Sequence, residues 1–248
     1  LSMDYQKFID RLPSLYENWG EPSQTPKSPQ FQDILTDLQT VGNLNLMQLL
    51  NCAIEHLELG EIYCEIGCDI GINLVGGLLN FSDKMAYAVD RFSSHEDRIE
   101  LLLENLSRFD LEERVFVCQQ DFEEFFCDLR KLNLEEKIGI YFDRSSDDYR
   151  SRLLSLLLVK PFLSDKALIL VENSQRESVQ QAIWDFLAAN SEFDILLKLD
   201  RWSQTSDRDD CSLLILRYHV GCSHEYDWQA IQERHQPSIK QGIDNLSS

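Results

Sequence analysis

The chain has 248 residues, a hydrophobic content of 43% and a formal net charge of −20. It is long enough to bury a full core, which suits one α/β domain with extensions or at most two small domains. A surface this acidic repels phosphate backbones and anionic lipid headgroups, so we expect neither a nucleic-acid nor a membrane partner.

The cysteines indicate a reducing compartment. There are seven of them, none forms a CxxC pair, and Cys118 lies within an apolar run. We therefore expect reduced, buried thiols in a cytoplasmic protein rather than a disulfide scaffold. The longest apolar run, residues 153–159, is too short to span a bilayer. The oligomeric state is left open, a homodimer included.

Residues 1–58 are expected to form an N-terminal helical extension. The pattern predicts a short helix at residues 5–12, and prolines among polar residues then predict an extended loop. Apolar residues recur at helical spacing over residues 31–58, with an interruption at Gly42 and Asn43.

From residue 59 to residue 220, short apolar runs alternate with helical stretches. The runs predict strands at residues 62–67, 85–90, 114–119, 138–143, 167–172, 194–200 and 212–220. The stretches between them predict helices at residues 73–79, 96–108, 122–132, 148–158 and 177–190. This alternation predicts an α/β fold, with a Rossmann-like, doubly wound, mostly parallel sheet of about seven strands and helices on both faces. Residues 221–248 are expected to be a polar tail with one helix at 228–234.

Acidic residues stand at or just beyond the ends of the first five predicted strands. Ligands of open α/β sheets bind outside the carboxyl ends of the strands, so five acidic ends predict a ligand crevice. The ends present Glu65 with Gly67 and Gly71, Asp90 with Arg91, Asp121 with Phe122, Asp143, and Glu172 with Asn173. Glycines in the turn would let backbone N–H groups approach a ligand closely. For Asp90 and Asp121, a helix cap is the alternative role.

The ordered strand ends resemble the class I methyltransferase family that uses S-adenosylmethionine. The E-x-G-x-x-x-G at residues 65–71 resembles its first motif without the middle glycine, and the resemblance covers about residues 40–220. It implies that the glycine turn faces the methionine part of the cofactor, that Asp90 holds the ribose, and that Asp121 with Phe122 holds the adenine. The implied cofactor-binding set is Glu65, Gly67, Cys68, Gly71, Asn73, Asp90, Arg91, Asp121, Phe122 and Asp143. A dinucleotide fold would instead show G-x-G-x-x-G, which the chain lacks.

Residues 143–149 resemble the D-x-x-K-D-x-Y segment of cation-dependent O-methyltransferases, such as the catechol and caffeoyl-coenzyme A enzymes. That family holds magnesium or another divalent ion with an Asp here and an Asp-Asn pair after the fifth strand. The resemblance implies metal ligands at Asp143, Glu172 and Asn173, whose oxygens suit a hard cation. The ion would lower the pKa of an acceptor hydroxyl, with Asp143 and Tyr149 as catalytic residues.

Departures from that family leave the activity open. Ser146 stands at the position of its catalytic lysine, and Glu172 replaces an aspartate. Of the five histidines, only His95 lies near the predicted crevice, and a surface role is favoured for it. Three hypotheses remain. The first is transfer of a methyl group to an oxygen or nitrogen of a small-molecule acceptor, with or without a divalent cation. The second is a catalytically degenerate cofactor-binding or protein-interaction module, and the third is an unrelated Rossmann-like enzyme.

Aromatic residues outside the sheet are candidates for covering an acceptor pocket. The methyltransferase family often builds that pocket from an N-terminal extension, which here contains Tyr16, Trp19 and Phe31. Ordinary packing onto the sheet is the alternative for each. Trp202, in the polar loop before the last strand, would lie over the pocket or in a dimer interface.

Overall fold

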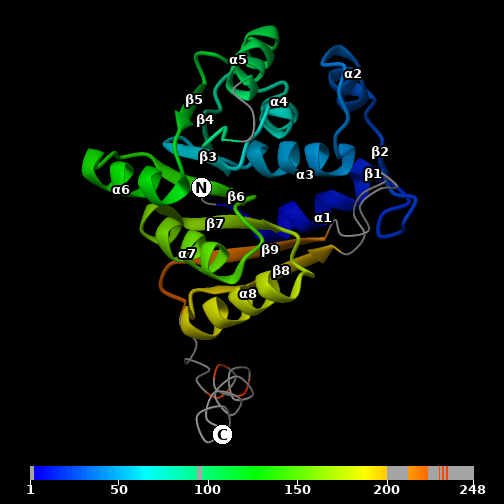
Figure 1. Ribbon diagram of the computed structural model, residues 1–248. Coiled ribbons are helices and arrows are strands. Elements are labelled where there is room, and N and C mark those ends of the chain that lie inside the picture. The colour runs from blue at the N-terminus through cyan, green and yellow to red at the C-terminus, as the bar shows by residue number, and fades with distance from the viewer. Residues whose placement is uncertain are drawn as a thin grey trace, which may run out of the picture.

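A seven-stranded sheet forms the centre of the protein (Figure 1). The computed structural model describes residues 3–93, 97–199 and 212–222, together with Gln229, Ile231 and Glu233. The strands are β3 Glu61–Ile66, β4 Ala86–Asp90, β5 Val115–Gln119, β6 Lys137–Asp143, β7 Leu163–Glu172, β8 Phe193–Leu199 and β9 Leu213–His219. They lie in the order β5-β4-β3-β6-β7-β9-β8. Strands β3 to β7 pair in parallel, whereas β9 is antiparallel to both β7 and β8.

Eight α-helices surround the sheet within the described residues. They are α1 Tyr5–Leu15, α2 Gln30–Asp37, α3 Leu44–Glu55, α4 Ile72–Leu78, α5 Arg98–Arg108, α6 Phe122–Leu132, α7 Tyr149–Val159 and α8 Glu177–Ala189. Short polar side chains start several of them, because they accept a bond from a backbone N–H left free in the first turn. Asp4 caps α1, Asn43 caps α3, and Asp148 caps α7 in this way.

The predicted α/β fold is confirmed, including the seven strands and the helices between them. Strand β7 begins at Leu163, earlier than predicted, since its first residues pair with Ile138 of β6 although polar residues interrupt the apolar run. The prolines of the extension also do not exclude regular structure. Helix α1 continues past Pro13, and the two-residue strands β1 Tyr16–Glu17 and β2 Thr25–Pro26 pair with each other. His95 and Trp202 lie outside the described residues.

Each face of the sheet has its own core. Side chains alternate along β3, so that Tyr63 belongs to the core beneath α1 to α5, and Cys64 belongs to the core beneath α6, α7 and α8. Figure 1 shows α6, α7 and α8 following one another along one side of the sheet. A parallel sheet covered on both faces leaves its strand ends as the place where polar residues can gather.

The N-terminal extension contributes to the same core as the sheet. Phe8, Leu12 and Phe31 are fully buried in the cluster that also contains residues of β6 and β7. The hydroxyl of Tyr5 donates to the backbone carbonyls of Tyr218 and, at 3.3 Å, of Ala167. Tyr16 is also buried, so packing rather than a lid accounts for Tyr16 and Phe31, while Trp19 is half-buried against Tyr16.

The cysteines of the described residues are all free thiols, but they are not all buried. Cys52, Cys64 and Cys68 are buried, Cys118 is half-buried, and Cys127 and Cys222 are exposed. The expectation of buried thiols is therefore corrected for the last three: Cys118 of β5 packs only at the margin of the core beneath α6, α7 and α8, Cys127 lies on the exposed face of α6, and Cys222 follows β9. No helix in the described part of the chain has both the length and the apolar character needed to cross a membrane.

Replacement of Phe8 tests whether the extension is an integral part of the core. We expect Phe8→Ala to lower the free energy of unfolding by about 3–5 kcal/mol, because it opens a cavity beneath α1. Lys7→Ala, at the neighbouring exposed position, should change it by less than about 0.5 kcal/mol. Urea denaturation of both variants measures the difference, and equal effects would show that α1 does not stabilise the folded domain.

Candidate functional site

The structure brings the predicted strand-end residues to one edge of the sheet. Because β3 to β7 are parallel, their carboxyl ends lie side by side at that edge. Glu65 precedes the end of β3, Asp90 ends β4, Asp143 ends β6 and Glu172 ends β7. Asp121 follows β5 and caps α6. These ends form what we call the carboxyl edge.

The turn between β3 and α4 is shaped by contacts with the protein itself. Gly67 and Gly71 have φ of +78° and +79°, in the left-handed region that favours glycine. A Cβ on Gly67 would lie 2.6 Å from the backbone oxygen of Arg144, and one on Gly71 would lie 2.4 Å from Cδ1 of Leu102. The backbone conformation and the close packing of the fold therefore explain both glycines without a ligand. Whether their backbone also meets a ligand stays a prediction.

Glu65 is a fully buried carboxylate at this turn. Its Oε2 accepts from the hydroxyl of Tyr63 at 2.9 Å, and its Oε1 accepts from Nδ2 of Asn73 at 3.2 Å. Burial raises the pKa of Glu65 from 4.5 to about 7, although Arg144 and these hydrogen bonds oppose the shift. Burial also raises the pKa of the adjacent Cys68 thiol well above its ordinary value, so this thiol is not a ready nucleophile.

Arg144 joins the ends of three strands. Its Nη1 lies 3.1 Å from the Gly67 carbonyl oxygen and 3.5 Å from Oε1 of Glu65. Its Nε donates to Oε2 of Glu172 at 3.0 Å, and its guanidinium lies 5.9 Å from the centre of the Phe142 ring. No sequence pattern above assigns this role to Arg144. The available signal was an arginine directly after Asp143, among five strand ends that all carry acidic residues.

The ends of β4 and β5 are also bound by protein donors. The two carboxylate oxygens of Asp90 accept from the backbone N–H of Asp69 at 3.0 Å and of Phe92 at 2.9 Å. Asp121 caps α6 through Oδ1, as its alternative role predicted, and its Oδ2 lies 3.2 Å from Nη2 of Arg91. Each carboxylate oxygen has a second lone pair, so Asp90 can still accept a hydrogen bond from a ligand hydroxyl.

Phe122 is buried, with a relative exposure of 9% for the whole residue. It is the first residue of α6 and belongs to the core beneath α6, α7 and α8. Its predicted contact with an adenine ring stays a prediction, and burial leaves only a small part of its ring for that contact.

Asp143 is held in a buried ion pair. Both Asp143 and Arg152 of α7 are fully buried, and Nη1 of Arg152 lies 2.9 Å from Oδ1 of Asp143. The same Oδ1 accepts from the backbone N–H of Ser145, while Oδ2 is enclosed without a protein partner. Asp143 is therefore not open to a substrate from the crevice in this arrangement.

The other residues of the 143–149 segment tie it to the segment after β7. Asp147 accepts from Nδ2 of Asn173 at 3.1 Å and pairs with Arg152 and Arg176. The hydroxyl of Tyr149 donates to Oδ2 of Asp185 on α8 at 3.0 Å. Tyr149 thus joins α7 to α8 and is not directed at Asp143.

The predicted metal ligands do not fit a divalent cation as they are placed. Asp143 pairs with Arg152 and Glu172 with Arg144, so the charge of each carboxylate is neutralised by an arginine. Asn173 uses its amide nitrogen to bind Asp147. Across the described ranges, no three or more histidine, cysteine, aspartate or glutamate residues are grouped to hold a metal ion. The physical reason is that arginines of the chain itself already balance the charges of Asp143 and Glu172.

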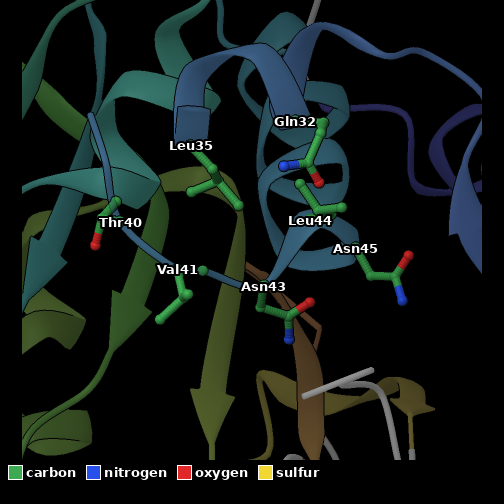
Figure 2. A pocket seen from close by; sticks show the side chains of 8 residues that line it. Gln32, Leu35, Thr40, Val41, Asn43, Leu44 and Asn45 are labelled. Carbon is green, nitrogen blue, oxygen red and sulfur yellow. The ribbon is translucent and has the colours of Figure 1, made fainter. Parts of the chain in front are cut away.

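A cavity of about 280 Å³ lies between α2 and the start of α3 (Figure 2). Gln32 and Leu35 of α2 line it together with the connecting residues Thr40 to Asn45. Gly42 in its wall packs so closely against the helix α4 that an added Cβ would lie 3.1 Å from Cγ2 of Ile72. Ile72 follows Gly71 directly, so one wall residue of the cavity contacts the first residue of α4, next in the chain to the glycine turn.

Comparison with solved structures identifies the fold. An O-methyltransferase from Bacillus cereus superimposes with a TM-score of 0.59 and 14% identity, covering 78% of this chain and 92% of that one. The O-methyltransferase TomG from Streptomyces achromogenes gives 0.58 and 11%, covering 88% and 100%. Precorrin-8w decarboxylase from Methanobacterium thermoautotrophicum gives 0.53 and 18%, covering 73% and 92%. The chain has the class I methyltransferase fold. No protein-family model matches the sequence, and no curated protein does.

Substitution of two glycines with the same backbone conformation tests the close packing at the turn. Gly20→Ala should cost about 1–2 kcal/mol of stability, because Gly20 has φ of +82° but nothing within 4 Å of the added Cβ. Gly67→Ala should cost about 1–3 kcal/mol more, since its Cβ meets the Arg144 backbone. Chemical denaturation of both variants gives the comparison. Equal losses would contradict the packing.

The raised pKa of Glu65 predicts a pH dependence of stability. Between pH 4.5 and 7 the folded protein holds a proton that the unfolded chain has released. The associated stability is present below pH 4.5 and is lost as the pH rises through 7, by about 3 kcal/mol in total. Glu65→Gln should remove this loss, so the variant gains stability relative to wild type with rising pH. Urea denaturation across this pH range measures it, with the exposed Glu17→Gln as control, and parallel curves for all three proteins would contradict the shift.

Proposed function

We propose that the protein transfers a methyl group from S-adenosylmethionine to an oxygen or nitrogen of a small, uncharged molecule, without a divalent cation. The observation that carries the proposal is the position of Glu65, the Gly67 carbonyl and Asp90 at one edge, together with an uncharged cavity whose wall contacts the start of α4. Solved structures of this fold support it, because the Bacillus cereus enzyme contains S-adenosylhomocysteine and TomG contains S-adenosylmethionine.

The residues of the turn suit the chemistry of that cofactor. A carboxylate and a backbone carbonyl, from Glu65 and Gly67, are the acceptors that an ammonium group requires. Asp90 offers its remaining lone pairs to ribose hydroxyls. Phe122 and the ion pair of Arg91 with Asp121 stand where the adenine is expected. The roles of these residues toward the cofactor rest on the resemblance and on their shared edge.

The cavity in Figure 2 is the proposed acceptor site. Its lining contains no charged side chain and combines the amides of Gln32, Asn43 and Asn45 with apolar groups, among them Leu35 and Val41. Such a lining favours a neutral molecule with a few polar groups. At about 280 Å³ it suits a small acceptor. Through Gly42 its wall contacts Ile72, the residue that follows the glycine turn, and methyl transfer requires the two bound partners to lie close together.

No titratable side chain of the described residues is placed as an obvious base for the acceptor. His56 bonds to the Cys52 carbonyl at the end of α3, and His219 pairs with Lys166 at the opposite edge of the sheet. Asp143 is fully buried in its ion pair. When bound, the cofactor supplies a methyl group already activated by its sulfonium charge. The contribution of the protein is then to orient an acceptor that is nucleophilic in itself and to exclude water.

A non-catalytic module of the same fold is the second candidate, and a specific observation favours it. Arg144, Arg152 and Arg91 pair with the strand-end carboxylates that the resemblance assigns to cofactor and metal. A protein that binds a partner without turnover would also have its strand-end carboxylates paired with arginines of its own chain.

Thermal unfolding with added ligands separates the candidates. S-adenosylhomocysteine at about 100 times its Kd should raise stability by about 2.7 kcal/mol, a Tm shift of about 5–11 °C. NAD should give no shift, and magnesium should add nothing. Asp90→Ala should reduce the shift, whereas Asp83→Ala, an exposed surface aspartate, should leave it unchanged. A shift without turnover on a panel of uncharged hydroxyl and amine acceptors would favour the binding module, and the absence of any shift would contradict the proposal.

A further inference from the structure

One cation of the chain occupies the acceptors of the glycine turn. Nη1 of Arg144 contacts both the carbonyl oxygen of Gly67 and Oε1 of Glu65. Its Nε is fixed by Glu172, across the carboxyl edge. The guanidinium therefore lies in the glycine turn. This inference rests on the proposed function, under which the same turn receives the amino-acid tail of the cofactor.

The tail and Arg144 require the same partners. An ammonium has three donors and no acceptor, and the fully buried carboxylate at this turn is Glu65. The remaining partners of Glu65, which are the Tyr63 hydroxyl and the Asn73 amide, are uncharged. If the ammonium entered beside the guanidinium, two positive charges would share one buried carboxylate, and their repulsion is only weakly screened there.

We propose that Arg144 is an internal competitor of the cofactor. In the free protein Arg144 binds Glu65 and the Gly67 carbonyl. When the cofactor binds, the ammonium of its tail replaces Arg144 at these two acceptors. One cation replaces another, so the buried Glu65 stays neutralised throughout. Glu172, with 25% of its side chain exposed, retains Arg144 through Nε. An adenosine compound that lacks the amino-acid tail binds without displacing Arg144. Arg144 is thus a residue that determines specificity for the tail.

Calorimetric titration of two adenosine compounds tests the competition. S-adenosylhomocysteine carries the ammonium, and methylthioadenosine lacks the whole amino-acid tail. Arg144→Gln should lower the Kd for S-adenosylhomocysteine by about tenfold, which is the order expected when one charge-assisted hydrogen bond no longer competes. It should leave the Kd for methylthioadenosine unchanged. Arg144→Lys keeps a competing cation and should stay close to wild type. Arg150→Gln, an exposed arginine of α7, is the matched control.

The outcomes separate this inference from the proposed function. Weaker or equal binding of S-adenosylhomocysteine by Arg144→Gln, with methylthioadenosine binding intact, would overturn the competition and leave the cofactor site standing. Failure of every variant and of wild type to bind either compound would overturn both proposals. Should Arg144→Gln not fold, the wild-type protein provides the test through the nitrogen-15 signal of the Arg144 guanidinium. That signal should move with S-adenosylhomocysteine and not with methylthioadenosine, and an unmoved signal under saturation would overturn the competition.

Discussion

The burial of the Glu65 carboxylate is the constraint on which the carboxyl edge depends. A carboxylate without exposure to water needs donors for its oxygens and a nearby positive charge, because an unpaired buried charge costs several kcal/mol. Tyr63 and Asn73 supply neutral donors from the same turn region, and Arg144 supplies the charge from the next strand. The pairing of β3 with β6 therefore also places the charge of Arg144 beside the buried carboxylate of the turn.

A second buried charge organises the neighbouring strand ends by the same rule. Arg152 reaches from α7 to Asp143 and Asp147, and Asp147 in turn holds Asn173 after β7. Together with Arg144, this arginine neutralises the carboxylates that a hard cation would need. The carboxylates of Glu65, Glu172 and Asp143 are thus all in ion pairs, and under the proposed competition a ligand with a positive group reaches Glu65 by exchange with Arg144.

The sequence predicted the fold well because strands and helices leave local periodic signals, and helix α6 was bounded correctly at both ends. It predicted which residues gather at the carboxyl edge, since parallel strands share one direction. It could not predict their partners. Arg144 and Glu65 are separated by 79 positions and Tyr149 and Asp185 by 36, and no local pattern records such pairs. The cap at Asp121 was predictable because its partner lies three residues away.

Gly67 contacts both the backbone and the side chain of Arg144. The Arg144 backbone packs where a Cβ on Gly67 would stand, and the Arg144 side chain binds the Gly67 carbonyl. The glycine that resembles a ligand-binding motif is therefore required first by the fold. The same close approach delivers a cation to the buried carboxylate, so the turn is formed and neutralised before any ligand arrives. Under the proposed competition, a cofactor that binds at this turn replaces the Arg144 guanidinium with its own ammonium. Its affinity is then set by the small difference between the free energies with which the turn binds these two cations.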